Sequence, residues 1–171
     1  MEFFNVLKKR RSVRAFTSRP IEESKIRQIL EASNSAPSAG NLQSYEIFLV
    51  VDEKKKRELA LASFAQSFVA EAPLVLVFCA NPVRAEKRYG KRGRNLYCIQ
   101  DATIAATYAQ LAAVDLGLAS CWVGAFDEKE ILRILGNPAD LIPVAVIPIG
   151  YPAEEPKPTS RRKLEELVKR L

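Results

Sequence analysis

The stretch Leu74-Val75-Leu76-Val77-Phe78-Cys79 decides the fold, because it is a nearly continuous apolar run of strand length. A run of this kind is typical of a strand that is covered on both faces. Three further segments, 45–51, 119–123 and 141–149, also have strand-like composition. Segments with helical spacing of apolar residues separate them, so the sequence predicts an α/β or α+β sheet protein.

Helices are expected in the segments between these strands. The longest is predicted from about Tyr97 to Leu116, where many alanines keep its girth small enough to pack against several neighbours, including a symmetry mate. Gly117 follows it, as glycine commonly does past a helix end. Shorter helices are predicted around 3–7, 22–36, 54–62, 63–70, 127–135 and 163–171.

Length and composition indicate one domain spanning residues 1–171. The chain is 48% hydrophobic and 27% charged, which is usual for a globular protein. No segment approaches the roughly twenty apolar residues of a membrane span. The start, Met1-Glu2-Phe3-Phe4-Asn5, lacks the apolar run of a signal peptide, so we expect a cytoplasmic protein with no membrane partner.

The titratable residues limit the chemistry that the chain can perform by itself. It contains no histidine, which removes the commonest general base and metal ligand. Cys79, Cys98 and Cys121 lack the paired spacings of zinc or redox motifs, so they are interpreted as reduced thiols. We expect no metal site, and an enzyme of this composition would rely on a bound cofactor.

The positive charge is gathered in three places. The net charge is +6, and basic residues cluster at 8–14, 84–94 and 161–163. This balance favours an anionic partner, whether phosphate, nucleotide or nucleic acid. Within the first cluster, Arg10-Arg11-Ser12-Val13-Arg14 has the chemistry to grip a phosphate, because guanidinium groups bind its oxygens in pairs and a serine hydroxyl can donate as well. A solvated surface is the alternative for such a run.

Four segments together resemble the nitroreductase family of flavin-dependent oxidoreductases, and the resemblance covers essentially the whole chain. They are Arg10–Arg14, Pro37-Ser38-Ala39-Gly40-Asn41-Leu42-Gln43, Gly117-Leu118-Ala119-Ser120-Cys121-Trp122-Val123-Gly124, and Ile149-Gly150-Tyr151-Pro152 followed by Arg161-Arg162-Lys163. The resemblance implies an α+β fold with three layers, in which helices flank a central, mostly antiparallel sheet. It also implies an intertwined homodimer.

The resemblance further implies FMN as cofactor. In the family the amino-terminal basic segment binds the FMN phosphate, which gives Arg10, Ser12 and Arg14, with Arg11, that role. The carboxy-terminal arginines close over the same phosphate, so Arg161 and Arg162 are candidates. No catalytic side chain is implied, since the flavin carries the chemistry.

Two more segments are implied to reach the flavin ring. The loop Pro37–Gln43 comes from the other subunit, with Pro37, Ser38 and Ala39 along the ring edge and Asn41 and Gln43 offering amide hydrogen bonds. Ser44 stands where the family often has proline, so the end of the loop departs from the family pattern. Val123 and Gly124 are expected to bring backbone groups against the redox-active centre. Gln66 is a weaker candidate near the cofactor.

The function implied is an FMN-dependent oxidoreductase that takes hydride from NADH or NADPH and reduces a small-molecule acceptor such as a nitroaromatic or quinone. Two sites would form in a homodimer centred on the alanine-rich helix. Residues 84–94 are predicted to be a mobile loop or lid that attracts the anionic donor. The alternatives are a basic nucleic-acid-binding domain, which lacks any recognisable binding motif here, and a flavin-binding protein without reductase activity.

Overall fold

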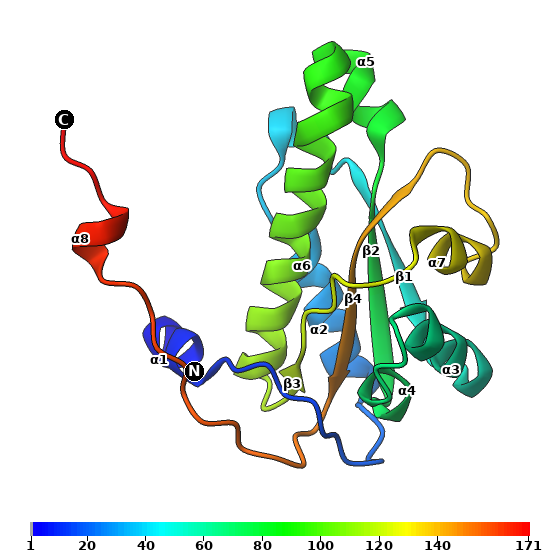
Figure 1. Ribbon diagram of the computed structural model, residues 1–171, viewed down its shortest axis with the longest axis vertical. Coiled ribbons are helices and arrows are strands. Elements are labelled where there is room, and N and C mark those ends of the chain that lie inside the picture. The colour runs from blue at the N-terminus through cyan, green and yellow to red at the C-terminus, as the bar shows by residue number, and fades with distance from the viewer. Residues whose placement is uncertain (1) are drawn as a thin grey trace.

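The computed structural model describes residues 2–171 and contains a four-stranded sheet with the strand order β1-β2-β4-β3. The strands are β1 (Tyr45–Val50), β2 (Leu74–Ala80), β3 (Ala119–Ser120) and β4 (Ile142–Gly150). Every neighbouring pair is antiparallel. The expected antiparallel sheet is therefore confirmed (Figure 1).

Strand β2 lies inside the sheet and is fully buried, as the apolar run predicts. Its side chains alternate between two hydrophobic cores. Leu74, Leu76 and Phe78 belong to one core, and Val75, Val77 and Cys79 belong to the other. Both faces of the sheet are therefore covered.

Helices form a layer on each face of the sheet, which confirms the three-layer arrangement (Figure 1). One layer contains α2 (Glu23–Asn34) and α6 (Cys98–Asp115). The other contains α3 (Glu53–Ala62), α4 (Phe68–Glu71) and α7 (Glu128–Ile134). The side chain of Asp127 caps α7 by accepting from the N–H groups of Lys129 and Glu130, as expected for an aspartate at this position.

The alanines of α6 pack against the chain's own sheet. Ala102, Ala105, Ala106, Ala109 and Ala113 are all fully buried in the core. The small side chains let α6 lie close to the sheet. Three other apolar residues of α6, Ile104, Tyr108 and Leu111, are partly exposed and lie on its outward side.

Residues 84–94 are helical, so the prediction of a loop there is wrong. They belong to α5 (Pro82–Arg92) and the π-helical turn η2 (Gly93–Tyr97). Asn81 caps α5 by accepting from the N–H of Arg84 at 3.0 Å. Gly90 adopts a φ of 55°, which kinks the helix but does not end it.

The predicted strand 119–123 is shorter than expected. After β3 the pairing with β4 is interrupted and resumes only as an isolated bridge between Val123 and Val146. Pro148 faces the gap in β4, and proline has no N–H to donate to a ladder. The backbone of residues 121–124 is therefore less regular than a strand.

Both ends of the described chain project from the body. The first helix, α1 (Phe3–Lys9), buries only Val6, and the tail beyond Pro152 runs extended to α8 (Leu164–Leu167), which buries nothing (Figure 1). Phe3, Phe4 and Leu164 are each at least 60% exposed. Within residues 2–171, no helix combines the length and apolar character needed to span a membrane.

Candidate functional site

The basic segment Arg10–Arg14 is fixed along the edge of the sheet beside β3. The N–H of Val13 donates to the carbonyl oxygen of Ser120 at 3.1 Å, and Ser12 forms a parallel bridge with the same residue. Gln110 of α6 donates to the hydroxyl of Ser120 at 3.1 Å. This backbone pairing presents alternate side chains of the segment on the same side.

Alternation along the segment places Arg10, Ser12 and Arg14 on one side, in the neighbourhood of Cys121. Burial raises the pKa of the Cys121 thiol, while Arg14, the Ser12 hydroxyl and Arg10 act in the opposite direction. Neither guanidinium has a carboxylate partner within residues 2–171. The structure thus brings together three of the residues assigned to the phosphate.

The backbone at Arg14 already holds an anion. Its N–H donates to a carboxylate oxygen of Glu154, which lies at the start of the tail. An N–H that accommodates a carboxylate can accommodate a phosphate oxygen as well, because both are anionic acceptors. Together with Arg10 and the Ser12 hydroxyl, this donor set fits the phosphate of FMN.

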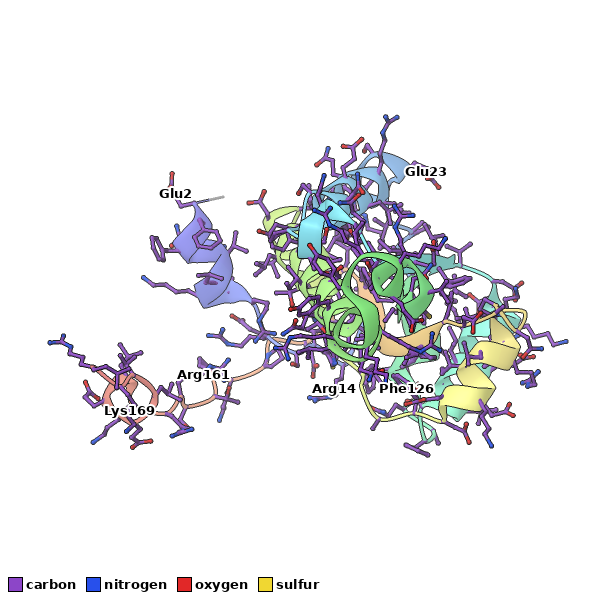
Figure 2. The ribbon with its side chains drawn as sticks, turned by 90° about the horizontal axis from the view of Figure 1, so that it is seen from above. Glu2, Arg14, Glu23, Phe126, Arg161 and Lys169 are labelled. Atoms are coloured by element: carbon purple, nitrogen blue, oxygen red, sulfur yellow. The ribbon has the colours of Figure 1, made fainter. Side chains whose placement is uncertain are left out.

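The other predicted phosphate ligands are placed differently. Arg11 turns back on its own segment, where Nη1 donates to the carbonyl oxygens of Lys8 at 2.6 Å and Arg10 at 2.8 Å. Arg161 and Arg162 lie on the tail, where they contact Thr159 and Glu166. Figure 2 shows Arg161 well separated from Arg14 within one chain.

The segment 121–124 leaves only part of its backbone free. The N–H of Val123 donates to Val146 at 3.0 Å, so it is occupied by the sheet. The N–H of Gly124 has no acceptor within residues 2–171, and this glycine is exposed. Gln66 lies beside it and donates to the carbonyl oxygen of Ala125 at 3.4 Å. Of these two residues, only Gly124 therefore has an N–H left to donate to a ligand.

The cysteine thiols are not activated. Burial raises the pKa of Cys79 to about 12 and also raises that of Cys98. All three cysteines are buried and free. A thiol in such surroundings stays protonated and is a poor nucleophile, which agrees with the absence of a catalytic role for Cys121.

The second set of predicted residues lies in the loop 37–43, which is held by Asp101. This buried carboxylate stands in the first turn of α6. It accepts from the N–H of Ala39 at 2.9 Å and from the N–H of Ser44 at 3.4 Å. Asp101 escaped the sequence-based prediction, although an acid on the buried side of the first turn of an alanine-rich helix was a usable clue.

The loop itself has a constrained backbone. Gly40, Asn41 and Gln43 all adopt left-handed φ values, of 57°, 55° and 43°. The side chain of Gln43 donates to Asn41 at 2.6 Å and to Ser38 at 3.2 Å. Non-glycine residues in this region store strain, which is concentrated at functional sites.

Helix α5 braces the loop from the other side. Arg84 donates to the carbonyl oxygen of Leu42, and Arg88 donates to that of Gly40 at 3.1 Å. A Cβ on Gly40 would collide with the hydroxyl of Tyr89 and with Arg88. The basic stretch and the loop are therefore one packed unit, a relationship that no local pattern in the sequence indicates.

The predicted site has two halves, the phosphate segment Arg10–Arg14 and the loop 37–43. They lie toward opposite ends of α6 (Figure 1). Asp101 holds the loop, whereas Val114 lines a hollow together with Arg11 and Val13. These two helical positions are about 20 Å apart at about 1.5 Å per residue. In one chain the phosphate segment and the loop 37–43 are therefore separated along α6.

Comparison with known proteins gives consistent matches. The model of the nitroreductase family matches residues 7–80 and 59–151. A Thermus thermophilus protein named NADH dehydrogenase is 35% identical, with 94% of this chain and 91% of that protein covered. FMN reductase [NAD(P)H] of Bacillus subtilis is 31% identical, with 90% and 67% covered.

A solved structure of a nitroreductase is also similar to this chain. The FMN-dependent nitroreductase of Clostridium difficile superposes with a TM-score of 0.79 and is 33% identical. The match covers 92% of this chain and 91% of that one. Both the sequence and the three-layer architecture are thus shared over nearly the full length described here.

Proposed function

The chain belongs to the nitroreductase family, and on that premise we propose that it is an FMN-dependent oxidoreductase using NADH or NADPH. The names of the relatives support this, because they include an FMN reductase and an FMN-dependent nitroreductase. The observation that carries the proposal is the extended segment 10–14, which pairs with Ser120 and presents Arg10, Ser12 and Arg14 on one side beside β3.

Residues 1–171 act as one FMN-binding domain in this proposal. Arg10, Ser12 and the Arg14 backbone and side chain bind the FMN phosphate, while Arg11 supports them by fixing its own segment. Arg161 and Arg162 complete the phosphate site once the tail is docked in the dimer. Pro37, Ser38 and Ala39 lie along the ring edge, and Asn41 and Gln43 hydrogen-bond to its polar atoms.

Backbone groups of residues 123 and 124 face the redox-active part of the flavin ring in this proposal. When bound, FMN would supply the hydride chemistry that connects a nicotinamide donor to a small acceptor such as a nitroaromatic or quinone. The N–H of Gly124 is free to donate where negative charge develops on the ring. Val123, whose N–H is held by Val146, fixes the position of Gly124.

A homodimer supplies the missing half of each site. The halves are about 20 Å apart along α6 in one chain, so an antiparallel pairing of two α6 helices would bring each loop to the partner's phosphate site. Ile104, Tyr108 and Leu111 offer an apolar stripe for that pairing. Phe3 and Phe4 of α1 and the tail are also exposed and available.

Spectroscopy on the purified protein tests the activity. A flavin absorbance spectrum, native or after reconstitution with FMN, is expected, and a protein that cannot be reconstituted would favour the nucleic-acid-binding alternative. Anaerobic addition of NADH or NADPH should bleach the flavin band. A protein that binds FMN but is bleached by neither donor would be a flavin-binding protein without reductase activity.

Mixed dimers test the two-chain site. One chain carries Arg10→Ala and Arg14→Ala, the other carries Asn41→Ala and Gln43→Ala, and the heterodimer is isolated with two different tags. One of its two sites combines only intact halves, so it should bind up to about one FMN while each variant homodimer binds little. Heterodimers without FMN, or an N41A/Q43A homodimer that retains it, would contradict the shared site.

A further inference from the structure

Five basic residues of α5, here called the α5 cation patch, lack any ion pair within residues 2–171. They are Arg84, Lys87, Arg88, Lys91 and Arg92. By contrast, the neighbouring Arg94 pairs with Glu86 at 2.7 Å. Arg84, Lys87 and Arg88 have i, i+3 and i+4 spacing and share one helix face. So many unneutralised cations on a short helix repel each other, and an anionic ligand would relieve that repulsion.

The patch has a fixed position relative to the loop 37–43, here called the flavin loop. Arg84 and Arg88 are tied to the carbonyl oxygens of Leu42 and Gly40. The close approach of Gly40 to Tyr89 leaves no room between helix and loop. The patch thus accompanies the loop to whichever site the loop serves.

An open groove of about 540 Å³ adjoins both features. The loop lines it with Pro37, Ser38 and Ala39, and η2 contributes Tyr97. Arg92 donates to the Tyr97 hydroxyl at 3.0 Å and lies over the ring, which places a cation at the rim. Arg92 therefore links the cation patch to the groove through Tyr97.

Two members of the patch are free to bind. Lys87 and Lys91 are exposed and make no hydrogen bond or ion pair inside the described chain. Arg84, Arg88 and Arg92 are held by the loop or by Tyr97 and add positive potential from fixed positions. Flexible ammonium groups beside fixed guanidiniums can adapt to phosphates of differing placement.

We propose that the α5 cation patch binds the phosphate groups of the nicotinamide dinucleotide and so makes NADPH the preferred donor over NADH. The inference rests on the proposed function, because it assumes that a dinucleotide enters the groove beside the flavin. Both donors carry a diphosphate, but NADPH has an additional phosphate with a charge of about −1.5 to −2. A patch with no internal carboxylate partners favours the more highly charged donor.

The test measures the apparent Kd of each donor from the concentration dependence of anaerobic flavin reduction by the holoprotein. The variant is Lys87→Gln with Lys91→Gln. The matched control is Lys54→Gln with Lys55→Gln, which removes the same charge from exposed positions at the start of α3. The apparent Kd for NADPH should rise about three- to tenfold in K87Q/K91Q, as expected for exposed charge pairs, and that for NADH should rise less.

Two further readouts identify the mechanism. The reduction rate at saturating donor should be unchanged in K87Q/K91Q, since these lysines act on binding. The wild-type preference for NADPH should narrow as salt is raised from about 20 mM to about 300 mM, because ions screen exposed charges.

Failure of this proposal is distinguishable from failure of the proposed function. A holoprotein that both donors reduce with equal apparent Kd, or a K87Q/K91Q variant that behaves like the control, would overturn the role of the patch and leave the activity standing. A protein that neither binds FMN nor is reduced by any donor would instead overturn the function itself.

Discussion

The carboxylate of Asp101 accepts a hydrogen bond from the N–H of Ala39 at 2.9 Å, which ties the first turn of α6 to the middle of the flavin loop. The same carboxylate reaches Ser44, so it spans both ends of the strained segment. Replacing Asp101 with alanine should lower the free energy of unfolding by about 2–3 kcal/mol, because two N–H groups lose a charged acceptor. It should also weaken FMN binding by loosening the loop.

The variant Asp101→Asn provides the control for that prediction. The asparagine oxygen can still accept from one of the two N–H groups, but its NH2 group cannot accept from the other. An intermediate effect is therefore expected. Urea unfolding of the apoprotein and FMN titration report the two effects separately. If Asp101→Ala left both quantities unchanged, Asp101 would have no part in positioning the loop.

Gly40 tests the packing between the loop and α5. Gly40→Ala forces a side chain into left-handed backbone and into contact with Tyr89, with an expected loss of about 1–2 kcal/mol from the backbone alone. Adding Tyr89→Phe removes the colliding hydroxyl and should recover part of the stability. Thermal unfolding of the single and double variants checks this, and a double variant no more stable than G40A would argue against the contact.

Glu154 occupies an N–H that the phosphate is expected to use. Replacing it with glutamine removes a negative charge beside Arg14 and should lower the Kd for FMN about two- to fivefold, since exposed charge interactions are small. Glu155→Gln is the control, because Glu155 is also exposed but makes no hydrogen bond within residues 2–171. Fluorescence titration of the apoprotein measures the Kd for FMN in each variant. An equal change in Kd for Glu154→Gln and Glu155→Gln would show a general charge effect only.

Glu22 gives the fold a defined pH dependence. A hydrogen bond from the Tyr151 hydroxyl, at 2.6 Å, is the main cause that lowers the pKa of Glu22 from its usual 4.5 to about 2. The stabilisation is therefore present above about pH 4.5 and is lost as the pH falls toward about 2. The difference in unfolding free energy between wild type and Glu22→Gln should shrink over that range. A difference independent of pH would contradict the assignment.

The sheet and the site segments were predictable from sequence where local patterns carry the information. The run 74–79 identified the central strand because burial on both faces removes alternation. Arg10, Ser12 and Arg14 share one side because the segment is extended, while their role in binding a phosphate stays a prediction. In each case the relevant contacts follow from the periodicity of the backbone itself.

The features that the sequence did not predict correctly have a different origin, since they depend on contacts between distant segments. Residues 84–94 were predicted to be a loop, but the cap at Asn81 and packing against the loop 37–43 keep 82–92 helical. Pro148 shortened the neighbouring strand by removing a donor on the partner, which the sequence of 119–123 does not reveal. The role of Asp101 likewise depends on a loop 62 residues away.

The most direct test of the central claim is the Kd of FMN for the variant Arg10→Ala with Arg14→Ala, compared with Lys8→Ala with Lys9→Ala. Both variants lose two positive charges from neighbouring positions, and circular dichroism establishes that each is folded. The arginine variant should bind FMN at least about 100-fold more weakly, because each lost charged hydrogen bond costs about 1.5 kcal/mol or more. The lysine variant should retain FMN, and unchanged retention in R10A/R14A would contradict the account.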